Sequence, residues 1–266
     1  MTRSYKKNFG ILIIVIILVV SLIGPYLPYH DPFSINLEEG LSPPSSSHLL
    51  GQDKLGRDVL SRLIHGARLS LEVGIITVSI SLLIGLLLGS VVSFTRPLIG
   101  EFIMRLSDIV QAFPGILLAI ALASILGPSK NNVILSLSLL GWVGYFRLTR
   151  AELLKWKNST LVMAERCIGA STMRILAIHL LPKIIPILSI QALFGMASAV
   201  MAEGALSFLG IGVSLPHPSL GNMIAEARPF IAIAPYLTLF PGFTIMLLIL
   251  GLHLLGDAML HPDKEC

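Results

Sequence analysis

The chain has 266 residues, of which 54% are hydrophobic and 13% charged, and its mean hydropathy is +0.84. Soluble domains carry about 25% charged residues, so this composition excludes a soluble globular protein and indicates lipid as the main solvent. The formal net charge of +4 is small and unevenly distributed, so it indicates membrane topology rather than nucleic-acid binding. The two cysteines, Cys167 and Cys266, have no ligand spacing and predict neither a disulfide framework nor a metal site.

The apolar residues are gathered into long runs without charge. A helix needs about 20 apolar residues to cross roughly 30 Å of hydrocarbon. Runs of this kind occupy residues 9–27, 73–94, 109–129, 131–146, 184–202 and 229–256. Lipid offers no hydrogen-bond partners, so a segment that crosses the membrane must pair its backbone groups in a helix or in a closed β-barrel. Runs of this length that are interrupted by Gly and Pro cannot form a barrel, so each run must be helical. We therefore predict an all-α polytopic membrane protein with six transmembrane helices.

Residues 1–28 are expected to form an N-terminal tail and the first transmembrane helix. Basic residues at 3, 6 and 7 precede this helix, which is also typical of a cleaved signal peptide. The apolar core is longer than the usual signal core, and no small-x-small cleavage site follows it. These features favour a retained signal anchor.

Residues 29–68 are expected to be extracytoplasmic. Within them, the segment Leu50–Arg68 alternates glycines with charged residues such as Asp53, Arg57 and Arg62. One interpretation is an ordered cap whose internal ion pairs seal the start of the second span. The other is a contact for an external protein partner. Exposed ion pairs contribute only about 0–1 kcal/mol each, so packing must supply most of the stability of such a cap.

The third and fourth spans are separated by Gly127-Pro128-Ser129-Lys130, which predicts a tight turn between antiparallel helices. At the inner end of the third span, Arg105 and Asp108 stand three residues apart, which predicts an ion pair on one helix face. Small residues such as Gly85, Gly89 and Gly195 indicate close helix packing.

The loop at 147–183 contains seven of the 19 Lys and Arg residues. We predict two short helices in it, the first over residues 160–168. Gly169 follows at the position where a helix end favours a residue that tolerates a left-handed backbone. Ser171 is a candidate N-cap for the second helix, which Pro182 is expected to end.

This loop combines apolar positions with a charged rim, which is typical of an interface for a soluble protein partner. An amphipathic loop that lies on anionic lipid headgroups is the alternative.

The fifth span is followed by Glu203, which apolar and small residues flank on both sides. Ionisable residues at membrane depth are functional candidates. We therefore name Glu203, Ser198 and Met201 as candidates for a translocation path. The alternative for Glu203 is a structural pair with another residue.

The distribution of basic residues predicts the orientation, because Lys and Arg favour the cytoplasmic side. With the N-terminus inside, 13 of the 19 Lys and Arg residues lie in inner segments. The six assigned to the outside are Lys54, Arg57, Arg62, Arg68, Lys130 and Arg228. Both termini and the basic loop are therefore expected in the cytoplasm.

A series of motifs in fixed order runs through most of the chain. These motifs are His48–Arg62, Gly66–Leu71, Met104–Pro114, Gly169–Ser171, Leu181–Pro182, Leu206–Gly212, Pro241–Gly242 and Leu254–Asp257. The series resembles the binding-protein-dependent ABC importer permeases, and within them the second permease of dipeptide, oligopeptide and nickel systems. Two positions depart from that pattern. Met163-Ala164-Glu165 stands where the family has Glu-Ala-Ala, and Leu220 stands where a tryptophan is common.

The resemblance implies a permease core at 69–258 with a coupling loop at 147–183, followed by a cytoplasmic tail at 259–266. It implies that the loop docks onto an ATPase subunit through Ala164, Glu165, Arg166, Gly169, Ala170, Ser171, Leu181 and Pro182. It also implies a heterodimer with a second permease, two ATP-binding subunits and an extracytoplasmic solute-binding protein in a bacterial inner membrane.

In that arrangement the partner subunits hold ATP and Mg²⁺, and this chain holds no cofactor, metal or catalytic site. The sequence has no Gly-rich phosphate loop, which agrees with this expectation. Short peptides are the expected substrate, with nickel or a metal chelate as the alternative. An ion-coupled secondary transporter is the alternative of a different class.

Overall fold

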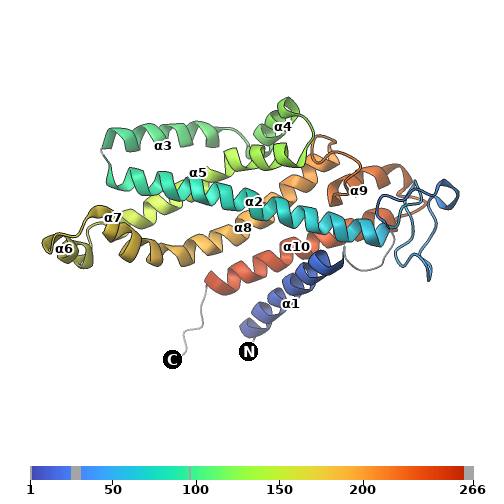
Figure 1. Cartoon of the computed structure of the whole chain (residues 1–266), viewed down its shortest axis with the longest axis horizontal. Helices are drawn as coiled ribbons and strands as arrows, with labels where there is room; N and C mark the ends of the chain where they lie inside the picture. The colour runs from blue at the N-terminus through green and yellow to red at the C-terminus, as the bar shows by residue number, and fades with distance from the viewer. Residues whose placement is uncertain (1, 25–30, 96, 261–266) are drawn as a thin grey trace.

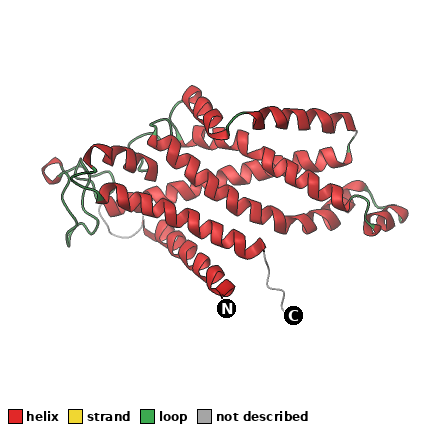
Figure 2. Ribbon diagram, turned by 180° about the vertical axis from the view of Figure 1, so that it is seen from behind, coloured by secondary structure: helices red, strands yellow, loops and turns green. Residues whose placement is uncertain are grey.

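The computed structural model describes residues 2–24, 31–95 and 97–260, and within them it contains helices and no β-strand (Figures 1 and 2). The helices are α1 (Thr2–Ile23), η2 (Leu37–Glu39), α2 (Val59–Phe94), α3 (Pro97–Ala112), α4 (Gly115–Leu126), α5 (Lys130–Trp156), α6 (Thr160–Cys167), α7 (Thr172–Arg174), η3 (Ile175–Leu180), α8 (Leu181–Phe208), α9 (Leu220–Ala227), η4 (Arg228–Phe230) and α10 (Tyr236–Leu260). The predicted all-helical membrane fold is confirmed.

Three helices in the described part of the chain are long and apolar enough to cross a membrane: α2, the continuous helix over Thr172–Phe208, and α10. The bent pair of α3 and α4 makes a fourth candidate. The predicted six spans also include α1, whose apolar stretch Asn8–Ser21 is shorter, and α5. The last turns of α5 contain Arg147, Arg150 and Lys155, which lower its mean hydropathy.

The second helix begins at Val59, well before the apolar run at residue 73, so the predicted extracytoplasmic segment 29–68 ends inside a helix. The carboxylate of Asp58 caps this helix by accepting a hydrogen bond from the backbone N–H of Ser61 at 2.7 Å. The first turns of α2 contain charged residues, which a helix tolerates near its N-terminus. A prediction from the charge-free run alone therefore made this helix too short.

The third span is not one straight helix over 109–129. Helix α3 ends at Ala112, α4 begins at Gly115, and their axes differ by 88°. Pro114 is the N-cap of α4, and a proline disfavours helical dihedrals at the residue before it. The predicted turn after α4 is confirmed, because Gly127 has φ +83° and α5 begins directly after Ser129.

The predicted pair between Arg105 and Asp108 is wrong. Arg105 contacts Glu101 of its own helix at 3.4 Å, and Asp108 contacts Arg147 of α5 at 2.5 Å. Helix α3 packs beside α5, so a basic residue of the neighbouring helix reaches Asp108. Sequence spacing identifies residues that share a helix face, but the neighbouring helix decides which partner is used.

Small residues allow the long helices to approach closely, as predicted. A Cβ atom on Gly85 of α2 would lie 2.5 Å from the Cβ of Tyr145 in α5. One turn later, a Cβ atom on Gly89 would lie 2.7 Å from the Cβ of Thr149. Glycine at these positions is therefore required for the contact between α2 and α5.

The bundle has two distinct ends (Figure 1). Helices α6 and α7 form one end, and α9 with the loop over residues 31–58 forms the other. Helices α1 and α10 lie side by side, and the first turn of α1 and the last turn of α10 both point toward the end that contains α6 (Figures 1 and 2). The predicted tail at 261–266 lies outside the described residues.

Candidate functional site

The loop between α5 and α8 contains the predicted helix, α6, which ends as the sequence indicates. The backbone N–H of Gly169 donates to the carbonyl of Arg166 at 3.0 Å, and that of Ala170 donates to the carbonyl of Glu165 at 2.9 Å. These two bonds form a Schellman motif, in which the residue after the helix is left-handed. Gly169 has φ +87°, which a residue with a Cβ adopts only with strain.

The second helix of the loop begins as predicted but does not end at Pro182. Ser171 caps it by accepting a hydrogen bond from the N–H of Arg174 at 3.3 Å, and the chain then stays helical to Phe208. The turn Ile175–Leu180 is π-helical, and the N–H of Leu181 donates to the carbonyl of Leu176. Proline lacks an N–H and crowds the preceding turn, and the wider π turn accommodates it there.

The loop is anchored on the long helices by an apolar cluster. Its fully buried members come from α5, α6, η3 and α8, and they are Leu153, Val162, Ile175, Leu180 and Ile184. Val78 of α2 and Tyr145 of α5 belong to the same cluster. The cluster therefore connects α6 to α2, α5 and α8 through closely packed side chains.

The opposite side of the loop exposes apolar side chains. Between 37% and 79% of each side chain is exposed in the set that we call the coupling surface: Leu161, Met163, Ile168, Met173 and Ile178. An exposed apolar patch with polar neighbours is typical of a protein interaction site. Of the predicted coupling residues, Ala164, Arg166, Gly169, Ser171 and Pro182 are exposed, and Glu165, Ala170 and Leu181 are half-buried.

A groove of 580 Å³ lies among α2, α4, α5 and α8. Two of the predicted path residues, Ser198 and Met201, line it. The other polar groups of its lining come from Thr77, Ser81, Tyr145 and Gln191. None of the residues that line this groove carries a formal charge.

Glu203, the third predicted path residue, does not line the groove. It is fully buried and accepts hydrogen bonds from the hydroxyls of Ser70 in α2 at 2.7 Å and Ser207 in α8 at 2.8 Å. Ser219, the N-cap of α9, bonds to the same carboxyl group. Glu203 therefore joins α2, α8 and α9, and the partners of its carboxyl group are serine hydroxyls rather than a basic residue.

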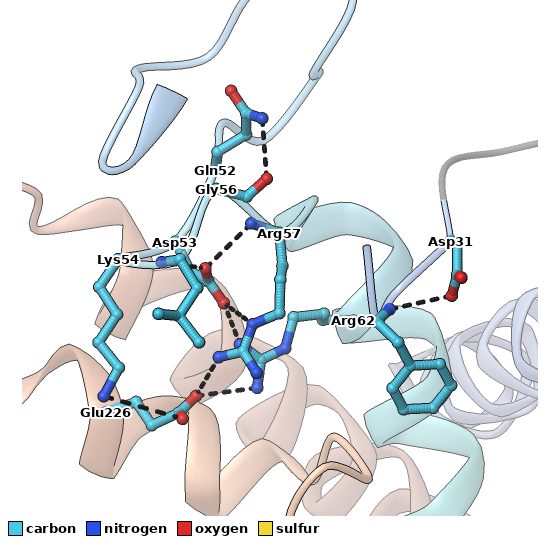
Figure 3. A network of polar contacts seen from close by, with 10 residues as sticks. Asp31, Gln52, Asp53, Lys54, Gly56, Arg57, Arg62 and Glu226 are labelled. Atoms are coloured by element: carbon cyan, nitrogen blue, oxygen red, sulfur yellow. Dashed lines mark hydrogen bonds and ion pairs between the residues drawn. The ribbon is translucent and has the colours of Figure 1, made fainter. Parts of the chain in front are cut away.

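The end of the bundle opposite α6 contains a buried ion-pair network (Figure 3). The carboxylate of Asp53 contacts Arg57 at 2.7 Å and also contacts Arg62. Both guanidinium groups contact Glu226 of α9 at 2.9 Å. The segment Leu50–Arg68 is therefore a salt-bridged cap on the start of α2, which supports the first of the two interpretations.

Sequence reasoning missed Glu226. The signal was present, because Glu226 is the sole acidic residue between Glu203 and Asp257, and the segment Leu50–Arg68 has four basic residues against two acidic ones.

The sequence and the fold both have known relatives. Residues 81–260 match the family model described as "Binding-protein-dependent transport system inner membrane component". The chain is 41% identical over 94% of its length to the di/tripeptide transport system permease protein DppC of Pseudomonas aeruginosa, covering 84% of that protein. It is 36% identical over 97% of its length to the dipeptide transport system permease protein DppC of Bacillus subtilis, covering 82% of that protein.

Among solved structures, the chain is similar to an inward-facing conformation of the MetNI methionine ABC transporter. The TM-score is 0.60 at 20% identity, with 74% of this chain and 93% of the other covered, which indicates a shared fold. The family match over residues 81–260 and the relatives above 30% identity agree with the coupling loop and the helical bundle. The chain therefore belongs to the binding-protein-dependent transport system inner membrane components, the permease subunits of ABC importers.

Proposed function

We propose that this permease imports short peptides across a bacterial inner membrane, with its coupling surface docked on a cytoplasmic ATP-binding subunit. The observation that supports this most directly is the two-sided construction of the coupling loop. Its buried side is continuous with the cores of α2, α5 and α8, and its other side exposes apolar residues such as Ile168 and Met173. A loop resting on lipid headgroups would need apolar contact with the membrane but not a packed connection to the long helices.

The mechanism follows from this connection. A second permease would complete the pathway, and two ATP-binding subunits, which hold ATP and Mg²⁺, would sit beneath the pair. Closure of those subunits would displace the coupling surface, and the apolar cluster would pass the displacement to α5 and α8. Because α8 contributes Ser198 and Met201 to the groove, the groove would change its access from one side of the membrane to the other.

The orientation supports the same arrangement. Seven basic residues lie at 147–183, and basic residues favour the cytoplasmic side. Both ends of the chain would then be cytoplasmic, and the cap on α2 would face an external solute-binding protein.

The groove supports peptides over a free metal ion. Nickel favours imidazole ligands, whereas the lining of this groove offers no histidine, cysteine or carboxylate and consists of neutral hydroxyls, one amide and apolar groups. Peptide bonds need hydrogen-bond partners of that neutral kind when they leave water. The curated relatives are named for dipeptide and di/tripeptide transport, which agrees with this choice. A nickel chelate with a neutral surface is the second candidate.

The test is reconstitution of the complex with Gly169→Trp in the permease. No heavy atom lies within 4 Å of a Cβ placed on Gly169, so the indole would project from the loop at the coupling surface. We expect membrane insertion to persist while peptide import per ATP hydrolysed falls at least tenfold.

Gly127→Trp is the matched control. Gly127 also has a positive φ and open space around its Cβ, but it lies in the turn between α4 and α5. Normal import by Gly169→Trp, or equal loss in both variants, would contradict the proposal. Uptake by the permease without any ATP-binding subunit would instead identify an ion-coupled secondary transporter.

A further inference from the structure

Helix α6 has an inner and an outer face. Val162 and Glu165 are three residues apart and therefore share a face. Val162 is fully buried, and the side chain of Glu165 is 22% exposed. Met163 and Arg166, by contrast, are exposed. Glu165 therefore points toward the body of the permease rather than toward the surface where a partner would dock.

The partner of Glu165 lies on the other side of the Gly169 joint. The Nε2 atom of His179 is 3.2 Å from the Oε1 atom of Glu165, and the His179 side chain is 27% exposed. His179 belongs to the π-helical turn η3, in which Ile175 and Leu180 are buried in the apolar cluster. This contact therefore connects α6 to a turn that is fixed on the long helices.

The two Schellman bonds fix Gly169 and Ala170 on the end of α6 but do not reach η3. Nothing lies within 4 Å of a Cβ placed on Gly169, and Cys167, Ile168 and Gly169 are exposed. The packing of Val162 holds α6 against the cluster, but apolar contacts are non-directional and do not by themselves fix an angle. Side chains of Glu165 and His179 that meet at 3.2 Å across the joint resist the separation of α6 from η3, so their contact can hold that angle.

We propose that Glu165 and His179 form a latch that holds α6 at a fixed angle to η3, so that movement of the coupling surface is transmitted without loss at Gly169. Glu165 is thus a positioning residue inside the loop and makes no contact with the ATP-binding subunit. This inference rests on the proposed function, because the latch matters for transport only if the coupling surface receives the motion of that subunit.

The first test needs the permease alone. A nitroxide spin label is attached to Cys167 in a Cys266→Ser background, and its mobility is measured in nanodiscs. We expect Glu165→Ala and His179→Ala each to increase the mobility of the label, and the double variant to increase it no further. Exchange of the two residues, Glu165→His with His179→Glu, should restore the low mobility.

Glu152→Ala is the matched control, because Glu152 pairs with Lys155 within α5 and does not bridge Gly169. It should leave the mobility of the label unchanged. Unchanged mobility in both single latch variants would overturn the latch, whatever the outcome for the proposed function.

The second test uses the complex with its ATP-binding subunits in proteoliposomes. Each single latch variant should lower peptide import per ATP hydrolysed about fivefold, the lower limit of typical coupling between two sites. The double variant should lose no more than either single variant, and the exchanged pair should recover.

A direct contact between Glu165 and the ATP-binding subunit gives a different result. In that case, Glu165→Ala alone weakens binding of the subunit, His179→Ala does not, and the exchanged pair fails to recover. That outcome would overturn the latch and leave the proposed function intact. Failure of the unaltered permease to bind any ATP-binding subunit would instead contradict the proposed function.

Discussion

The ion-pair network of the cap on α2 gives the sharpest stability prediction, through the change Glu226→Ala. The side chains of Arg57 and Arg62 are only 6% and 2% exposed, and both contact Glu226 at 2.9 Å. Removal of this carboxylate leaves two buried guanidinium groups with Asp53 as their shared partner (Figure 3). Two positive charges close together in a poorly solvated site repel each other and keep unmet hydrogen-bond donors.

The magnitude follows from the burial of these groups. Breaking a buried ion pair by removing one partner costs about 3–5 kcal/mol. Glu226 is itself 17% exposed, so water can partly replace it, and we expect a loss of about 3 kcal/mol in the free energy of unfolding.

The matched control is Glu72→Ala. Glu72 contacts Lys130 at 2.8 Å, but the two side chains are 45% and 38% exposed. An exposed pair contributes about 0–1 kcal/mol, so this variant should unfold almost like the unaltered protein.

The assay is unfolding of the purified permease in mixed micelles by titration with sodium dodecyl sulfate, followed by loss of helical circular dichroism. Glu226→Ala should shift the transition to a clearly lower detergent fraction than Glu72→Ala. Equal shifts in the two variants would refute the argument that burial of the arginines sets the cost.

Three further predictions concern the interior and the groove. Glu203→Ala leaves three serine hydroxyls without their shared acceptor, so its free energy of unfolding should fall by about 2 kcal/mol more than that of Glu203→Gln in the same titration. Equal losses in the two variants would count against the hydrogen bonds from these hydroxyls. In Gly221→Ala the new methyl carbon would lie 2.9 Å from the carbonyl carbon of Gly204 and nearer still to its oxygen, which predicts a loss of about 1–3 kcal/mol. Gly242 has open space around its Cβ, so Gly242→Ala should change the free energy of unfolding little in that assay. Similar losses in the two glycine variants would disprove the close approach of α9 to Gly204 of α8. Ser198→Trp should narrow the groove and reduce peptide import without changing co-purification of the ATP-binding subunits, and undiminished import would place the pathway elsewhere.

Features with a local cause could be predicted from the sequence. The end of α6 at Gly169, the cap at Ser171 and the turn at Gly127 each depend on the dihedral preference or hydrogen bonding of residues next to each other. Close helix packing at Gly85 was also visible, because small residues in an apolar run have few other uses, but the sequence did not identify α5 as the partner helix.

Features that depend on distant residues could not be predicted in the same way. Glu203 was visible as an ionisable residue in an apolar run, but its partners come from α2 and from the N-cap of α9. Asp108 was paired with the wrong arginine because Arg147 belongs to another helix.

Pro182 was misread for a related reason. A proline usually ends a helix, but here the π-helical turn that precedes it allows the helix to continue. Neither the apolar period nor the spacing of charges indicated that turn.

The most direct test of the whole account is the side of the membrane on which the coupling loop lies and what covers it there. Cys167 is an exposed thiol on α6, so in a Cys266→Ser background it reports on this loop alone. A membrane-impermeant maleimide should label Cys167 in inverted vesicles and not in right-side-out vesicles, and bound ATP-binding subunits should protect it. Labelling from the outer side, or equal labelling with and without those subunits, would contradict the account.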